Sequence, residues 1–127
     1  MKNKELTKAE EQVMLFLWAI SKGFLKDIVD MFPVPKPAYT TVSTVVRILV
    51  RKGFIGYKRY GKTNEYYPLV SKNDYFQNHV QSLITNYFNG SAPEFASFFA
   101  NEPLKRSELE EIKQMIEEKI EQIKKNE

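Results

Sequence analysis

The sequence predicts a mainly α-helical chain with a small β wing, and three observations lead to this fold class. Apolar residues recur at helical spacing over residues 9–20 and again over 42–50. Residues 54–69 alternate like two short strands around a loop, GKTN, whose composition is typical of a hairpin. New helical stripes begin after Ser71. This order is that of a winged helix-turn-helix head followed by a small helical dimerisation tail.

Two helices and a stiff connector are predicted before residue 40. Thr7 and Glu10 form a capping box at the start of the first helix, and Gly23 supplies the left-handed residue that ends it. Residues 24–31 form a second, short helix. The prolines in 33–37 then keep the chain extended, because proline has a fixed φ and no amide hydrogen.

The third helix should be capped by Thr40 or Thr41 and should end at Gly53. Many of its residues are β-branched, which lowers intrinsic helicity, so tertiary contacts must hold it. The side chains expected to face the core share one side of the helix, and they are Val42, Val45, Val46, Leu49 and Val50.

The opposite face of the third helix is hydroxylic and basic, which suits a helix that enters the major groove of duplex DNA. Its Ser and Thr side chains are short enough for close approach, and Arg47 is long enough to fork onto guanine or clamp a phosphate. Basic residues around the wing tip should meet phosphate or the minor groove. The alternative is an ordinary solvated surface. The candidate DNA-binding residues are Tyr39, Thr40, Thr41, Ser43, Thr44, Arg47, Arg51, Lys52, Lys58, Arg59, Lys62 and Thr63.

Charge is divided unevenly along the chain. Residues 1–70 carry 12 Lys and Arg against 6 Asp and Glu, whereas residues 71–127 carry 7 against 10, and the net charge is +3. A basic first half and an acidic second half indicate a polyanion-binding head and a tail with another role. We therefore expect a winged-helix DNA-binding domain over 1–70 and a helical dimerisation domain over 71–127.

The tail is expected to hold two chains together as a homodimer. Its helices carry more aromatic and aliphatic residues than so small a unit can bury alone. A symmetric dimer is the default closed assembly, and it would present two heads to a two-fold-related DNA site. The alternative is a monomer whose tail folds back on the head. The candidate dimerisation residues are Phe76, Val80, Leu83, Phe95, Phe98, Phe99, Leu109, Ile112, Ile116, Ile120 and Ile123.

The residue inventory argues against catalysis and metal binding. The chain has no Cys, which excludes a disulfide framework, a thiolate metal site and a cysteine nucleophile. His79 is the only histidine and has no nucleophile beside it in a known pattern, so we expect neither an enzyme nor a cofactor. The longest apolar run, 13–20, is too short to span a bilayer, and we expect a cytoplasmic protein without membrane insertion.

Three segments resemble the penicillinase repressor family (BlaI/MecI/CopY type): LTKAEEQVMLFLW from Leu6, AYTTVSTVVRILVRKGFI from Ala38 and EYYPLVSKNDY from Glu65. The resemblance implies a homodimeric transcriptional repressor that sits on a palindromic operator. It also implies that the recognition contacts come from the part of the third helix that matches the family's T-T-V-x-T pattern.

The family's branches differ in how the repressor is released. In the β-lactam branch a membrane-bound metallopeptidase receptor leads to cleavage of the tail, and the family's Asn is missing from the matching segment 98–100 here. The copper-responsive branch relies on a Cys-rich tail, which this chain lacks.

Two alternatives to this family remain. One is another dimeric winged-helix regulator of the PadR-like kind, and the other is a winged-helix adaptor that binds proteins rather than DNA.

Overall fold

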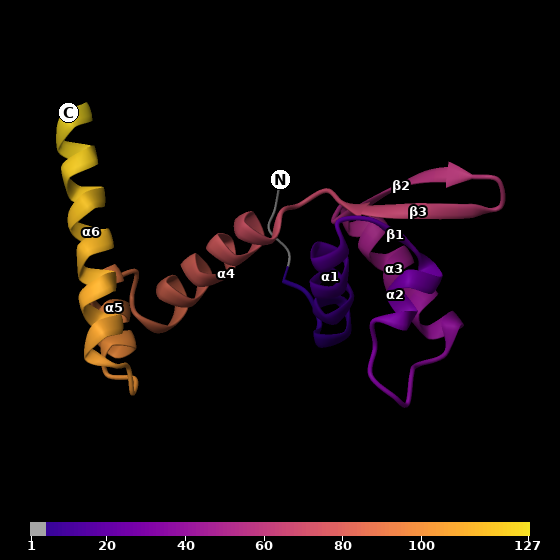
Figure 1. Cartoon of the computed structure of the whole chain (residues 1–127), viewed down its shortest axis with the longest axis horizontal. Helices are drawn as coiled ribbons and strands as arrows, with labels where there is room; N and C mark the ends of the chain where they lie inside the picture. Colours follow the sequence, from indigo (N-terminus) through magenta and orange to yellow (C-terminus); the bar gives the residue numbers. More distant parts are fainter. Residues whose placement is uncertain (1–4) are drawn as a thin grey trace. The chain divides into compact units, whose positions relative to one another are not determined.

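The computed structural model describes residues 5–127 as six helices and three short strands in two compact units (Figure 1). The elements are α1 (Lys8–Ile20), β1 (Gly23–Phe24), α2 (Leu25–Asp30), α3 (Tyr39–Lys52), β2 (Ile55–Tyr60), β3 (Thr63–Pro68), α4 (Lys72–Tyr87), α5 (Ala92–Ala100) and α6 (Arg106–Asn126). The first unit ends at Gln81 and the second is Ser82–Glu127, so α4 contributes to both. The predicted fold class is confirmed.

Helix α1 begins at the predicted capping box and ends earlier than predicted. The Glu10 N–H donates to Thr7 Oγ1 at 3.2 Å, and Glu10 Oε1 accepts from the Thr7 N–H at 3.0 Å. The prediction that Gly23 ends the helix in a left-handed conformation is wrong, because Ser21 takes the positive φ, 73°. A Cβ at position 23 would come 2.8 Å from Ile20 Cδ1 and 3.1 Å from Asp27 Cβ, so a larger residue there would require the Ile20 side chain to shift.

The wing belongs to a three-stranded antiparallel sheet in the order β1-β3-β2, which corrects the predicted two-stranded hairpin. Strand β1 is two residues long and places Gly23 opposite Tyr66, so it is too short to show an alternating pattern in the sequence. Strands β2 and β3 run to the tip, where Tyr60 pairs with Thr63 across a two-residue turn. Gly61 has a φ of 62° in this turn, as the first position of a type II′ hairpin requires.

The predicted start of helix α3 is wrong, whereas its predicted end is confirmed. It starts at Tyr39 with Ala38 at the N-cap position, so neither Thr40 nor Thr41 is the cap. A cap has a non-helical backbone, and here Ala38 is extended, with φ −67° and ψ 148°. The predicted end at Gly53 is confirmed by its φ of 86°.

The core of the first unit lies between α1, α2, α3 and the sheet. The buried side chains of this core are Val13, Met14, Leu17, Ile28, Val29, Val42, Val46, Leu49, Phe54, Ile55 and Tyr75. Val42, Val46 and Leu49 are the fully buried members of the predicted inner face of α3. Val45 and Val50 are half-buried at its edges. Burial of this one side leaves the opposite side of α3 in solvent.

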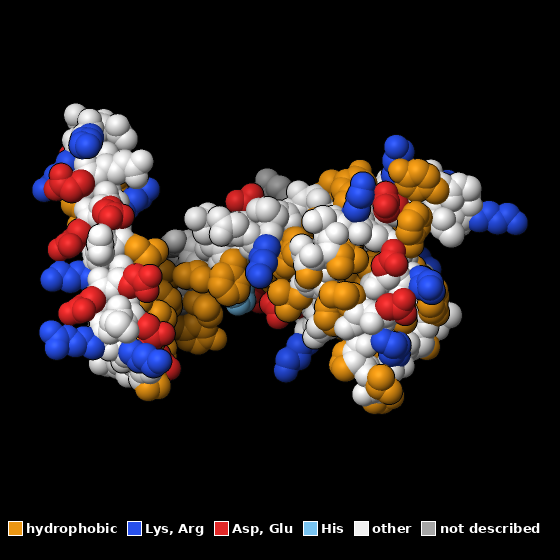
Figure 2. Space-filling view, in the orientation of Figure 1, with side chains coloured by type: hydrophobic (Ala, Val, Ile, Leu, Met, Phe, Trp, Pro, Cys, Tyr) orange, Lys and Arg blue, Asp and Glu red, His pale blue; other side chains and the backbone are white. Residues whose placement is uncertain are grey.

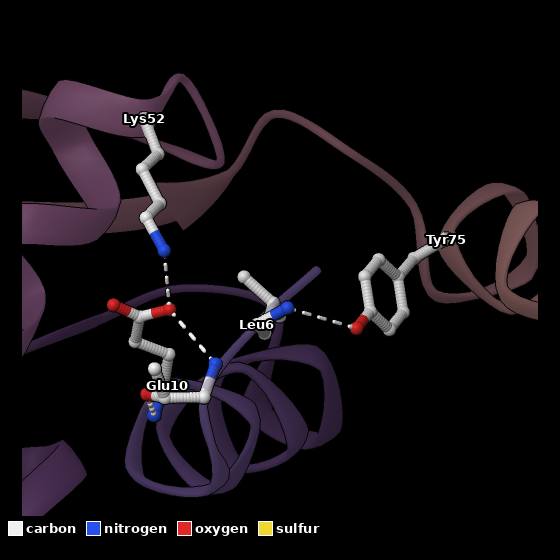
Figure 3. Close-up of polar contacts among 5 residues, drawn as sticks. Leu6, Glu10, Lys52 and Tyr75 are labelled. Atoms are coloured by element: carbon white, nitrogen blue, oxygen red, sulfur yellow. Dashed lines mark hydrogen bonds and ion pairs between the residues drawn. The ribbon is translucent and has the colours of Figure 1, made fainter. Parts of the chain in front are cut away.

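Glu10 is a charged residue buried at 5% exposure, and it joins α1 to the last turn of α3 (Figure 3). Its Oε1 accepts from Lys52 Nζ at 2.7 Å as well as from the Thr7 N–H. Burial alone would raise the pKa of the Glu10 carboxyl, but the hydrogen bonds and charge of Lys52 and the hydrogen bonds with Thr7 hold that pKa below its ordinary value. The pair therefore stabilises the position of α3 on α1.

Replacing Glu10 with Gln is expected to lower the free energy of unfolding by about 1–2 kcal/mol near pH 7, because Lys52 loses its charged partner. Since the folded pKa of Glu10 is lowered, its contribution is full above the unfolded value near 4.5 and is lost as the pH falls through the folded pKa. Urea unfolding of both proteins near pH 7 and near pH 3 measures this. The difference between them should shrink at the lower pH, and an equal difference at both would contradict the ion-pair account.

The second unit contains the end of α4 together with α5 and α6. Helix α4 stops at Asn89 and Gly90 as predicted, and these have positive φ angles of 54° and 78°. The Phe88 ring packs against Phe95 at 5.6 Å and Phe98 at 5.7 Å between centroids. No residue of α5 or α6 is buried within one chain. Apart from the half-buried Phe95 and Ile112, the apolar side chains of α5 and α6 are exposed.

Candidate nucleic-acid interface

Helix α3 presents one continuous polar face to solvent. We call this surface the α3 face, and it consists of the exposed residues Tyr39, Thr40, Thr41, Thr44, Arg47 and Arg51 with the half-buried Ser43. Helix α3 contains no Asp or Glu, so the face carries positive charge and hydroxyl groups only. The structure thus brings seven of the predicted DNA-binding residues onto one side of one helix.

Local hydrogen bonds order side chains of the α3 face and leave the Arg47 guanidinium available for other contacts. The Thr44 hydroxyl donates to the Thr40 carbonyl at 2.9 Å, which leaves the Thr44 oxygen as an acceptor. Arg47 Nη2 lies 3.5 Å from Ser43 Oγ, at the limit of a hydrogen bond. Among the described residues, neither Arg47 nor Arg51 is in an ion pair. The Arg47 guanidinium is free to form a forked contact with a guanine edge or a phosphate.

Lys52 is placed differently from the other predicted contacts. Its ammonium group is directed at the buried Glu10 carboxylate, and its side chain is only 24% exposed. Releasing it to reach a phosphate would leave Glu10 as an unpaired buried charge, which is costly. We therefore assign Lys52 to holding α3 in place. The sequence held no local signal of this, because the two partners are 42 residues apart.

The wing carries the remaining predicted contacts on its exposed outer half. Lys58, Arg59, Lys62 and Thr63 are all exposed. Arg59 Nε donates to the Gly61 carbonyl at 3.1 Å, which steadies the turn. Figure 2 shows a basic side chain that projects beyond the turn between β2 and β3. These positions suit contacts to the sugar–phosphate backbone or the minor groove.

A shallow pocket of about 260 Å³ lies between the wing and the first turns of α2 and α3. It is lined by Phe24, Leu25, Lys26, Tyr39, Lys62, Thr63, Asn64 and Tyr66. Three of the predicted contacts therefore meet at one place, and Lys26 joins them. Sequence reasoning missed Lys26, because the second helix was too short for its faces to be separated by their pattern. The only signal in the sequence was a basic residue near the start of the predicted second helix, and the structure shows that Lys26 is exposed in the first turn of α2.

Comparison with known proteins shows which family the chain belongs to. The profile of the family described as penicillinase repressor matches residues 6–118. The chain belongs to the penicillinase repressor family. The methicillin resistance regulatory protein MecI of Staphylococcus aureus (strain N315) is 27% identical over 120 residues, which are 93% of this chain and 98% of MecI. The penicillinase repressor of Bacillus licheniformis is 24% identical over 116 residues, or 90% of this chain and 91% of that protein.

A solved structure shows the fold of the head. The solution structure of the DNA binding domain of the repressor BlaI covers 57% of this chain and 90% of that domain, with 22% identity and a TM-score of 0.51. The head of this penicillinase repressor family member is therefore a winged helix. The family consists of DNA-binding repressors, a non-enzymatic kind of protein, and membership supports the role of a transcriptional repressor for this chain.

The predicted dimerisation residues of the repressor fall into groups. Phe95, Phe99, Leu109, Ile112 and Ile116 line a groove of about 370 Å³ between α5 and α6. Ile120 and Ile123 extend the apolar stripe along α6 at 45% and 47% exposure. Phe98 packs on Phe88, and Leu83 is half-buried near the end of α4. Phe76 and Val80 lie on the part of α4 that belongs to the first unit. Figure 2 shows hydrophobic side chains gathered over α5 and the adjoining part of α6.

Other kinds of site find no support in residues 5–127. The described residues contain no group of three or more His, Asp or Glu side chains placed to hold a metal ion. His79 stacks on the Tyr75 ring at 5.9 Å between centroids, which accounts for its half-buried position. No helix in this part of the chain is long and apolar enough to cross a membrane.

Proposed function

We propose that the chain is a homodimeric repressor that binds a palindromic DNA operator with α3 of each subunit in a major groove. The α3 face carries this proposal, because it combines short hydroxyl side chains with a free guanidinium and no carboxylate. Thr40, Thr41 and Thr44 allow the helix backbone to approach base edges, and a Thr methyl can contact a thymine methyl. Arg47 supplies the forked donor for guanine.

The wing and the pocket beside it would hold the DNA backbone. Lys62 at the wing turn and Lys26 at the start of α2 line the same pocket as Tyr39, and neither lysine is ion-paired among the described residues. A phosphate at this pocket would receive two ammonium groups and a phenol hydroxyl. Such contacts add affinity and orientation without sequence choice.

The uncovered sides of α5 and α6 support the homodimer. An exposed groove lined almost wholly by Phe, Ile, Leu and Ala is costly in water, and a second copy offers an identical surface to close it. Two heads held in this way would read two related half-sites. The monomer with a tail folded onto its own head remains the alternative, and the oligomeric state decides between them.

The competing roles are less well supported. An adaptor that binds proteins without DNA would need an apolar or acidic α3 face, and this face is hydroxylic and basic. A PadR-like regulator would share the DNA role and differ in its inducer and dimer geometry.

The resemblance also favours release of the repressor by a membrane-bound metallopeptidase that acts on the tail. Phe98 and Phe99, in the matching segment, are 57% and 43% exposed on α5 in a single chain, and the proposed dimer would cover Phe99 because it lines the groove between α5 and α6.

Retention of the DNA immediately upstream of the repressor's own gene tests the proposal. The chain should shift this duplex in a gel at protein concentrations where a shuffled duplex of the same composition stays free. A mixture of tagged and untagged chains should give a third complex of intermediate mobility, because each complex would contain two chains. Equal retention of both duplexes would refute sequence-specific binding, and the lack of an intermediate complex would refute the dimer.

Replacing Lys62 with Ala, or Lys26 with Ala, is expected to weaken binding to all duplexes by a similar factor. Each change should also reduce the slope of log affinity against log salt by about 1, because one phosphate contact is lost. Fluorescence anisotropy titrations at several salt concentrations measure both quantities. Lys119 on the tail helix α6 gives a matched control, since its replacement with Ala should leave the slope unchanged. An unchanged slope in the Lys26 variant would remove that residue from the interface.

A further inference from the structure

Asn64 carries a buried polar atom that the surrounding head leaves unpaired. Among residues 5–127, Asn64 Oδ1 is the one buried side-chain oxygen or nitrogen without a hydrogen-bond partner. A buried acceptor without a donor is unfavourable, and folded proteins keep few such atoms. The cross-strand neighbour Arg59 directs its Nε to the Gly61 carbonyl, at 3.1 Å, rather than to Asn64. The loss of stability at this position must therefore be offset by something that Asn64 does.

The wing turn does not account for an asparagine at position 64. Asparagine is common in turns because it tolerates positive φ and bonds to nearby backbone groups. The turn positions here are Gly61 and Lys62, whereas Asn64 lies within β3 and pairs with Arg59. Asparagine is also depleted in strands. Asn64 thus departs from two local rules at once, which is typical of residues kept for function.

The other end of the Asn64 amide is available to the pocket between the wing, α2 and α3. Asn64 lines this pocket, and its oxygen is the end that is buried. The nitrogen end, with its two hydrogens, can therefore face the pocket. Turning the amide over would bury two unpaired N–H groups, and buried unpaired donors are rarer than buried unpaired acceptors. The strand thus holds a neutral donor at the edge of the pocket.

The polar groups around this pocket suit an anion. The lining includes Lys26, Lys62 and Tyr39, and it includes no Asp or Glu. The two lysine side chains are long and lose much rotamer freedom when they are held in one place. Asn64 is short and is fixed on a paired strand. It can therefore fix the position of an anion that the lysines attract.

We infer that Asn64 is a DNA-contact residue whose amide nitrogen donates to a backbone phosphate in this pocket. The buried oxygen follows from holding the amide in that orientation. The inference rests on the proposed function, because the phosphate belongs to DNA bound by α3 and the wing. A neutral donor releases no counterion, so Asn64 adds affinity without adding to the salt dependence. This separates its contribution from those of Lys26 and Lys62.

Asn64→Leu in the full chain tests the inference, because leucine has the same branched shape without polar atoms. Its thermal unfolding midpoint should rise on the order of 4 °C, since the unpaired oxygen is gone. Its affinity for the upstream and shuffled duplexes should fall on the order of ten-fold, because each subunit loses a hydrogen bond. The slope of log affinity against log salt should not change. Asn78→Leu, the same exchange at an exposed position of α4 outside this pocket, should bind DNA as the unmodified chain does.

The side-chain NH₂ signals of Asn64 give a direct readout by nuclear magnetic resonance, and their absence from Asn64→Leu identifies them. They should shift when the upstream duplex is added. Inorganic phosphate at the same phosphate concentration should leave them in place, because only a duplex is also held by α3 and the wing. Equal shifts with both would make the pocket a site for small anions and would overturn the DNA contact.

Other outcomes also decide against the inference. If Asn64→Leu is unfolded or unfolds at a lower temperature, Asn64 is a structural residue and the inference fails. It fails as well if the folded variant binds DNA with unchanged affinity, or if the loss is confined to the upstream duplex, since a phosphate contact has no sequence choice. Failure of the unmodified chain to prefer the upstream duplex over a shuffled one would instead refute the proposed function, and that result does not involve Asn64.

Discussion

Replacing Ile116 with Asp is expected to convert the repressor into monomers and to weaken operator binding on the order of a hundred-fold, because the second head no longer binds with the first. Ile116 is 55% exposed in one chain and lines the groove between α5 and α6. A carboxylate at the centre of a closed apolar interface would be desolvated without a partner, at a cost of several kcal/mol. The same carboxylate costs little in the monomer, since no residue of α6 is buried there.

Sedimentation velocity and DNA titration of the same preparations measure this effect. Gln114→Asp gives a matched control, because it adds the same charge to α6 at an exposed position that does not line the groove between α5 and α6. This control should remain dimeric and should bind as the unmodified chain does. If Ile116→Asp sediments as a dimer with unchanged affinity, the groove is not the dimer interface. If the unmodified chain is itself a monomer at high micromolar concentration, the dimer proposal fails.

Replacing Arg47 with Ala is expected to weaken operator binding by about 1–3 kcal/mol and to have less effect on a shuffled duplex. The reason is that Arg47 is the long donor near the middle of the α3 face and has no competing ion pair among the described residues. Because the side chain is exposed, its removal should leave the thermal unfolding midpoint nearly unchanged. Loss of affinity can then be read as loss of a DNA contact.

Arg106→Ala is the matched control for Arg47, since Arg106 forms an exposed ion pair with Glu110 in the tail. Exposed pairs of this kind contribute little to stability, so the control should bind DNA normally. Competition titrations with operator and shuffled duplexes provide the measurement. An equal loss on both duplexes would make Arg47 a phosphate contact without sequence choice. No loss on either would remove α3 from the groove.

Local periodicity made the head predictable from the sequence. The helical spacing of Val42, Val46 and Leu49 predicted which side of α3 faces the core and which side faces solvent. In the structure these three side chains are buried. The capping box at Thr7 and the tight turn at Gly61 were also readable, because each depends on a few adjacent residues.

Contacts between distant residues were not predictable in this way. The role of Lys52 depends on Glu10, which is 42 residues away. The residues next to Lys52 therefore give no sign of this role, and the sequence predicts an exposed basic residue there. Tyr75 looks like an ordinary member of the apolar stripe on α4, and only the packing of Trp18 and Phe54 around it shows what it joins. The two-residue strand β1 is defined entirely by its partner β3.

Protection of guanine N7 from dimethyl sulfate tests the central claim most directly, because N7 lies in the major groove. If the α3 face enters that groove, the unmodified repressor will protect guanines in two symmetric clusters, and Arg47→Ala will lose protection at the same guanine in each half-site. Methylation that stays unchanged when the duplex is fully bound would contradict the account, since the repressor would then be binding without α3 in the major groove.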